Sequence, residues 1–98
     1  MRVLTEALAT RIELDGNVAK GVEFLVNGQT YKVKANKEVI CSAGTIQTPQ
    51  ILELSGIGDP AVLEKAGVHC KVENKRVGYG FQDHVLGLLS TFPTHVLR

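Results

Sequence analysis

Few side chains in this sequence combine the types and the spacing that catalysis requires. Asp83 and His84 are adjacent and suggest an acid–base pair. Neighbouring residues of an extended strand point to opposite faces, so these two side chains cannot act together on one substrate. We therefore expect both residues to have structural or cofactor-adjacent roles, and we predict no catalytic residue in this chain.

The thiols and imidazoles do not have the spacing of a metal site. The two cysteines, Cys41 and Cys70, match no zinc pattern together with His69 and His84. We predict that both cysteines are buried free thiols and that Cys41 packs rather than reacts, because nothing near it in the sequence would lower the pKa of its thiol. His69 and His95 lie among apolar neighbours and are expected to be structural.

Residues 44–58, GTIQTPQILELSGIG, indicate binding rather than catalysis. The small residues Ser42 and Ala43 precede this run, and Gly44 opens it with a residue that permits positive φ. A strand, a turn of small residues and a helix would let a flat ligand approach the backbone. We therefore predict ligand contacts at Ser42, Ala43 and Gly44. A generic turn followed by a glycine-stopped helix is the alternative for this run taken alone.

Alternating apolar residues predict the strands that would position this turn. A short strand is expected at Val3–Leu4, and a second over residues 9–14. The next two strands, residues 22–26 and 31–35, flank Asn27-Gly28, which is the strongest short hairpin signal. These pieces predict an antiparallel meander. Residues 38–41 are continuously apolar after Glu38, which is typical of a strand buried on both faces of a parallel sheet.

Capping signals predict two short helices. Thr48 is the expected N-cap of the first, with Pro49 at its first position, and residues 55–58 end it. Asp59-Pro60 begins the second helix, and Gly67 stops it. Strands are expected over residues 68–72 and 85–92. Residues 56–61 imitate a G-x-G-x-x-G fingerprint, but they follow a helix and place proline in the turn, so we reject that interpretation.

Length and composition set the class of protein. The 98 residues form at most one small domain, and the hydrophobic content of 44% argues against disorder. The chain has 11 basic and 10 acidic residues, which gives a net charge of +1, and the charges are dispersed. This predicts binding to neither nucleic acid nor an anionic membrane. The sequence shows no transmembrane run and no signal peptide, so it carries no indication of its location.

Six segments in order resemble one known family. Residues 44–58 resemble the second signature of the glucose–methanol–choline (GMC) oxidoreductases, and the other segments are VLTEALATRI, AKGVEF, KEVICSAG, IGDPAVLEKAGV and VG-x-x-x-QDH. The likeness is to fungal aryl-alcohol and glucose oxidase-like members. It implies a fragment of α+β or α/β class, namely a β-meander and a strand–turn–helix from a Rossmann-like FAD-binding domain.

The resemblance also implies which residues meet the cofactor. Ala9 falls where the family presents backbone groups to the adenine of FAD. The Ser42–Gly44 step falls where the sheet ends beneath the cofactor. This agrees with the rule that ligands of open α/β sheets bind beyond the carboxyl ends of the strands. Asp83 and His84 fall on a stretch that runs along the flavin. Gly80-Phe81 replaces the usual Asn-Leu of that stretch, and residues 74–76 replace the usual Leu-Pro-Gly.

The implied activity is FAD-dependent oxidation of a CH–OH group in an alcohol or sugar. The family's G-x-G-x-x-G fingerprint and its C-terminal His–His or His–Asn pair have no counterpart in the sequence. We therefore expect residues 1–98 to be a partial FAD-binding domain that is inactive by itself. Two alternatives stay open: a small non-catalytic interaction module or relic, and a different flavoprotein or nicotinamide enzyme with the same sheet topology.

Overall fold

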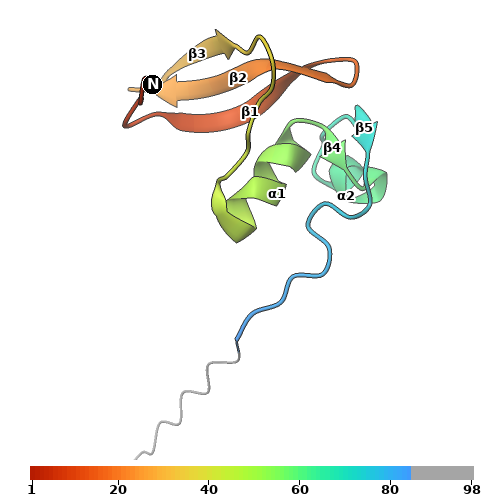
Figure 1. The fold of residues 1–98 in the computed structure, drawn as a ribbon. Coiled ribbons are helices and arrows are strands. Elements are labelled where there is room, and N and C mark those ends of the chain that lie inside the picture. The colour runs from red at the N-terminus through yellow and green to blue at the C-terminus, as the bar shows by residue number, and fades with distance from the viewer. Residues whose placement is uncertain (85–98) are drawn as a thin grey trace, which may run out of the picture.

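The computed structural model describes residues 1–84, which form a three-stranded sheet, two helices and a two-stranded sheet. Strands β1 (Leu8–Asp15), β2 (Val18–Val26) and β3 (Gln29–Lys34) are antiparallel and lie in the order β1-β2-β3. Helix α1 (Gly44–Leu54) packs below β1 (Figure 1). This arrangement confirms the predicted meander followed by a turn and a helix.

The hairpin of β2 and β3 forms where Asn27-Gly28 predicts it. Asn27 and Gly28 both have positive φ, 50° and 77°, and they join Val26 to its partner Gln29. Asparagine and glycine tolerate this left-handed conformation, which matches the twist of the flanking strands. Farther along the pair, Phe24 stacks on Tyr31 with ring centroids 5.9 Å apart.

The predicted strand at Val3–Leu4 is wrong. Both residues are exposed, at 73% and 63%, and they precede β1 without strand structure. Glu6 has a positive φ of 56°, which interrupts the extended chain between these residues and β1. Apolar character alone was the signal here, and it does not supply a neighbouring strand.

Helix α1 begins earlier than the sequence predicts. Its N-cap is Ala43, and Pro49 lies inside the helix rather than at its first position. Thr48 is not the N-cap. Its Oγ1 instead accepts a hydrogen bond from the N–H of Ala43 at 2.9 Å, and so acts on the helix start from within the first turns. Gly44, with φ of 89°, provides the change of direction that the helix start needs.

The end of α1 and the second helix agree with the predicted caps. Gly56 has a φ of 87° directly after the C-cap of α1. In α2 (Pro60–Lys65) the Asp59 carboxylate accepts from the N–H of Ala61 at 2.9 Å. Gly67, with φ of 71°, follows the helix. Local side-chain chemistry therefore fixes both boundaries.

A short parallel sheet joins the two helices. It consists of β4 (Ile57–Gly58) and β5 (Val72–Glu73). The strand predicted over residues 68–72 is thus confined to residues 72–73, and β4 was not predicted. The carbonyl oxygen of Gly56 accepts from the N–H groups of Lys71 at 2.8 Å and Val72 at 3.0 Å, so it begins the pairing.

The strand predicted at residues 38–41 does not form. This segment is extended but unpaired, and Ile40 is 78% exposed. Backbone groups of a strand need a neighbouring strand, and none lies beside this segment within residues 1–84. Cys41 and Cys70 are free, as predicted, but both are half-buried rather than buried.

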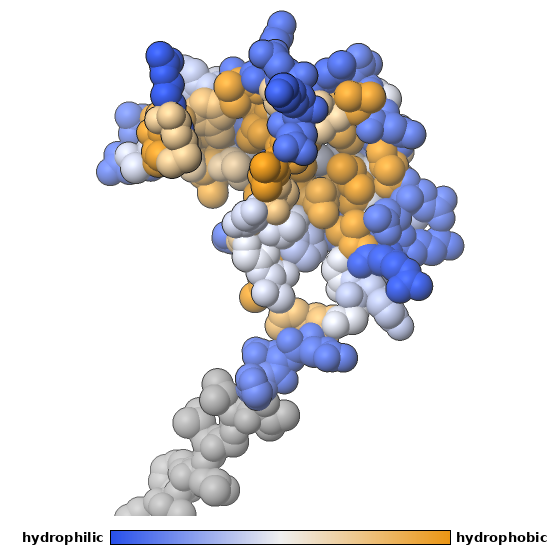
Figure 2. Space-filling view, in the orientation of Figure 1, coloured by the Kyte–Doolittle hydropathy of each residue, from blue (hydrophilic) through white to orange (hydrophobic). Residues whose placement is uncertain are grey.

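The apolar core of the described chain is small. Within residues 1–84, only Ile12 of β1 and Leu63 of α2 are apolar side chains exposed by less than a tenth. Apolar residues lie over much of the visible surface (Figure 2). No helix in residues 1–84 is long and apolar enough to cross a membrane, and no group of histidine, cysteine and acidic residues there could hold a metal ion. The predicted strand 85–92 and His95 lie outside the described residues.

Candidate functional site

A cavity of about 400 Å³ opens between the start of β1 and one face of α1. Residues 7–10 line one side, and the other side is formed by Ala43, Gln47, Gln50, Ile51 and Leu54. Its volume lies in the range of about 300–1,000 Å³ that small-molecule sites occupy. The cavity therefore brings together Ala9 and Ala43, two of the predicted cofactor-binding residues.

A second, smaller hollow of about 180 Å³ continues from the first. The two share Ala9, Ala43 and Ile51, and the smaller one adds the extended segment 39–42. Ser42 thereby joins the same region as Ala9. Three of the predicted cofactor-binding residues, Ala9, Ser42 and Ala43, thus converge although more than thirty positions separate the first from the others.

Gly44 has a different role from the two residues before it, Ser42 and Ala43. It lines neither hollow, and a Cβ added to it would meet nothing within 4 Å. Its φ of 89° turns the chain from the extended segment into α1. The glycine is therefore required for the path of the backbone, whereas Ser42 and Ala43 line the hollows.

Two polar residues of the cavity were missed in the sequence analysis. Gln47 and Gln50 both line it from α1. Together with Ile51 and Leu54 they occupy positions i, i+3, i+4 and i+7, which is one face of a helix. This periodicity was the available signal, and the misplaced helix start at Thr48 concealed it.

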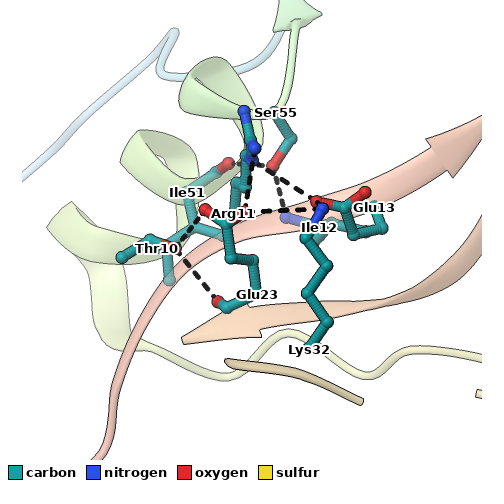
Figure 3. A network of polar contacts seen from close by, with 8 residues as sticks. All are labelled: Thr10, Arg11, Ile12, Glu13, Glu23, Lys32, Ile51 and Ser55. Carbon is teal, nitrogen blue, oxygen red and sulfur yellow. Dashed lines mark hydrogen bonds and ion pairs between the residues drawn. The ribbon is translucent and has the colours of Figure 1, made fainter. Parts of the chain in front are cut away.

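A β-bulge shapes the strand side of the cavity. Ala9 pairs with Phe24 and Arg11 pairs with Glu23, so Thr10 is the extra residue. The Thr10 hydroxyl is placed to donate to the backbone oxygen of Glu23 at 3.1 Å and to its carboxylate at 3.0 Å (Figure 3). Because a bulge re-aims the strand locally, this contact sets the direction of the β1 edge beside Ala9.

Ion pairs hold the same part of the sheet. Glu23 lies 2.8 Å from Arg11 and 3.7 Å from Lys32, and Glu13 lies 3.4 Å from Arg11 and 3.1 Å from Lys32 (Figure 3). The hydrogen bond from Arg11 is the main cause that lowers the pKa of Glu23 below its ordinary value of 4.5, and the Thr10 hydroxyl adds to it. The same contact raises the pKa of Arg11. Lys32 is exposed but paired with both glutamates.

Ser55 connects the two sides of the cavity. Its hydroxyl accepts from the N–H of Ile12 at 2.7 Å and donates to the carbonyl of Ile51 at 2.6 Å. The residue is only 2% exposed. Helix α1 is thus attached to β1 by a side-chain hydrogen bond at the end of the helix, next to the cavity.

Asp83 and His84 lie apart from this region. They belong to the segment that leads away from β5 (Figure 1), where the carboxylate of Asp83 accepts from the N–H of His84 at 2.7 Å. With Gln82 they border a separate open hollow. Earlier residues of the segment, Gly78–Gln82, lie beside Thr45 and Pro49 at the other face of α1. The structure therefore brings together the predicted residues before α1 with Ala9, but not the pair at 83–84.

The cavity fits one end of a dinucleotide cofactor such as FAD. Small side chains at Ala7, Ala9 and Ala43 leave space for a flat ring, and β1 is at an edge of its sheet within residues 1–84. An edge strand offers backbone donors and acceptors, which suit the ring nitrogens and amino group of adenine. The amides of Gln47 and Gln50 add further donors and acceptors.

Comparisons with known proteins agree with this fit. A family model described as GMC oxidoreductase matches residues 1–86. A dehydrogenase, mpl7, of Monascus purpureus is 50% identical over 95 residues, which are 92% of this chain and 15% of that protein. An oxygen-dependent choline dehydrogenase of Staphylococcus haemolyticus is 45% identical over 85 residues, covering 87% of this chain and 15% of the relative. The chain therefore spans about a seventh of the length of these relatives.

A solved structure shows the same fold. An FAD-dependent oxidoreductase from Chaetomium thermophilum superposes with a TM-score of 0.68 and 34% identity, covering 71% of this chain and 12% of that structure. The meander and the helix that border the cavity therefore have the arrangement of part of an FAD-dependent enzyme.

Proposed function

The chain belongs to the GMC oxidoreductase family, whose members are FAD-dependent oxidoreductases, and from this membership we propose that it forms one wall of an FAD site. The wall belongs to an enzyme that oxidises a CH–OH group of its donor. In this proposal residues 1–98 are part of the FAD-binding domain and contribute cofactor binding without a catalytic residue.

The observation that carries the proposal is the convergence of β1 and the start of α1 on one cavity. Ala9 from the strand and Ser42 and Ala43 from the turn lie around the same space. These are the positions where the resemblance to GMC enzymes implies contact with FAD. Neither the strand nor the turn alone would suffice, because the space exists only between them.

Each part of the wall has a distinct role towards the cofactor. The β1 edge at Ala9 offers backbone groups to the adenine ring, and Ala43 leaves room for it. Gln47 and Gln50 orient the nucleotide through their amides. Bound FAD would supply the flavin that accepts a hydride from the alcohol carbon, and this chain's residues keep the nucleotide end in place.

Asp83 and His84 are proposed to lie near the flavin end of the cofactor. Their support is the resemblance of Gln82-Asp83-His84 to the stretch that follows the flavin in the family. In the described chain they border a hollow of their own. They would meet the same FAD molecule only at its other end, far from Ala9.

The donor is proposed to be a small alcohol or sugar that binds to the longer enzyme. The relatives have names such as choline dehydrogenase, and one neighbour in structure is a pyridoxine 4-oxidase from Mesorbium loti. Those names describe the relatives only. The cavity described here contacts the cofactor, so it does not select among donors.

The isolated chain is proposed to be catalytically inactive. Residues 1–84 contain no paired acid and base beside the cavity, and this wall would cover only one end of the cofactor. We expect FAD to bind weakly, to be lost during purification, and to undergo no reduction when alcohols or sugars are added. A purified chain with bound flavin absorption that bleaches with an alcohol would contradict this.

The FAD wall is tested by titration of the labelled chain with FAD, followed through its amide resonances. We expect saturable shifts in residues 7–10 and 43–54. Ala43→Leu should fill the cavity and abolish these shifts, whereas Ala61→Leu, at an exposed position of α2, should leave them intact. If a nicotinamide dinucleotide shifts these resonances and FAD does not, the result would favour a nicotinamide enzyme with the same sheet topology. No shifts with either would favour the interaction module.

A further inference from the structure

Within residues 1–84, Ser55 is the one side chain that bonds both walls of the cavity. Its hydroxyl accepts from the N–H of Ile12 at 2.7 Å and donates to the carbonyl oxygen of Ile51 at 2.6 Å. The contact with the strand is covered, since Ser55 is 2% and Ile12 6% exposed. A hydroxyl that accepts from a strand and donates to a helix fixes the relative position of the two.

The bond is placed where it controls the cavity. Ile12 follows the bulged residue Thr10 by two positions on β1, and Ser55 directly follows Leu54 at the end of α1. Thr10 and Leu54 both line the cavity. A change in the distance between Ile12 and Ser55 would therefore open or narrow the space between the strand and the helix.

The residue after Ser55, Gly56, is closely approached by the segment that follows α2. A Cβ on Gly56 would lie 2.7 Å from the carbonyl oxygen of His69 and 3.1 Å from Cγ of Lys71. The chain after α2 thus packs directly against the backbone next to Ser55. The backbone that carries Ser55 is therefore packed on its far side, while the Ser55 hydroxyl bonds β1 and α1.

We propose that Ser55 is a positioning residue for FAD: its hydroxyl fixes the separation of β1 and α1 at the width that the adenine end of the cofactor requires. The role rests on the proposed function, because it assumes that FAD occupies this cavity. It is not a catalytic role, since the hydroxyl bonds two protein groups and acts on the cofactor only through the walls.

The experiment compares Ser55→Ala, which removes the hydroxyl, with Ser55→Thr, which keeps it. The first measurement is hydrogen exchange of the Ile12 amide in the full chain without ligand. The second is the FAD titration by amide resonances. Asp59→Ala serves as a control that lowers stability mildly at the cap of α2, which does not line the cavity. If Ser55→Ala does not fold, Ser55→Cys replaces it, because a thiol is a weaker hydrogen-bonding group of similar size.

We expect the Ile12 amide of Ser55→Ala to exchange about tenfold faster or more, and FAD to bind about tenfold more weakly. Ser55→Thr should restore both values towards those of the original chain. Asp59→Ala should lower stability with FAD affinity unchanged, which separates positioning from general destabilisation.

Two results would overturn the inference in different ways. If FAD shifts the cavity resonances of the original chain and of Ser55→Ala at the same concentrations, Ser55 does not position the cofactor although the FAD wall stands. If FAD shifts no resonances in the original chain, the FAD wall and the cofactor role of Ser55 fall together. In that case Ile12 exchange still reports whether Ser55 joins β1 to α1.

Discussion

Glu23 is the residue at which the polar contacts of the three-stranded sheet converge. Its carboxylate accepts from Thr10 and Arg11 and lies near Lys32. Although it is on a strand face, its side chain is only 13% exposed. The residue connects the bulge beside the cavity to the paired strand, so its charge affects the shape of the proposed FAD wall.

Stability should therefore depend on pH through Glu23. Because its pKa is lower in the folded chain than its ordinary value of 4.5, the folded state favours the charged form. This contribution is present above pH 4.5 and is lost as the pH falls through the pKa of the folded state. Glu23→Gln should reduce the fall in the free energy of unfolding below pH 4.5, measured by urea unfolding at several pH values.

The matched control is Glu38→Gln, which removes an exposed carboxylate from the segment between β3 and α1. It should leave the acid part of the profile as steep as in the original chain. An unchanged profile in Glu23→Gln would show that the contacts with Arg11 and Thr10 do not stabilise the carboxylate in solution.

Gly16 and Gly56 require glycine for different reasons. Both have positive φ, 57° and 87°, but only Gly56 is approached by other atoms, since a Cβ added there would lie 2.7 Å from the carbonyl oxygen of His69. Gly16→Ala should cost about 1–2 kcal/mol for the left-handed backbone alone. Gly56→Ala should cost more, because the chain around His69 must also move. Urea unfolding of both variants measures the difference, and equal costs would contradict the close approach.

At the scale of the elements, the sequence predicts features that neighbouring residues determine. Asn27-Gly28 specifies its turn because these residues accept positive φ, and Asp59 caps α2 through its own side chain. The strand expected at residues 38–41 depended on a distant partner, which no local pattern contains. The start of α1 was misplaced because Pro49 suits a first helical position by its lack of N–H, and the structure tolerates it farther in.

The candidate site was also predictable only in the parts that neighbouring residues determine. Small residues at Ser42 and Ala43 indicated an approachable backbone, and the resemblance to GMC enzymes pointed to Ala9. Their meeting around one cavity could not be read from the pattern, because it arises from the packing of α1 against β1, where Ser55 accepts from the N–H of Ile12. The bulge at Thr10 was equally hidden, since it arises from the register between two strands.

The cap of α2 gives a test at this scale. Asp59 accepts from Ala61 N–H at 2.9 Å, and α2 carries Leu63, the most buried apolar residue of the described chain. Asp59→Ala should lower the free energy of unfolding by about 1 kcal/mol, because the first turn loses its cap. Asp59→Asn keeps a capping oxygen and should recover most of the loss. Equal stability of Asp59→Ala and the original chain would show that the cap contributes nothing.

The described chain as a whole buries little apolar surface. Two apolar side chains are buried, whereas Ile40, Ile46 and Val3 are each more than 70% exposed. Burial of apolar area is the main source of folding free energy. We infer a small free energy of unfolding, so that ligand binding should change the stability of the chain visibly.

Thermal unfolding with and without FAD distinguishes a cofactor wall from an interaction module. A ligand that binds only the folded chain adds about 1.4 kcal/mol at ten times its Kd. For a domain of this size that raises Tm by about 5–10 °C. AMP, which carries the adenine end, should also raise Tm, whereas riboflavin should not, because the cavity at Ala9 lies apart from Asp83 and His84. Ala43→Leu should unfold at the same temperature with and without FAD. If the original chain unfolds cooperatively and neither FAD nor AMP changes its Tm, the result indicates a module that folds without a nucleotide.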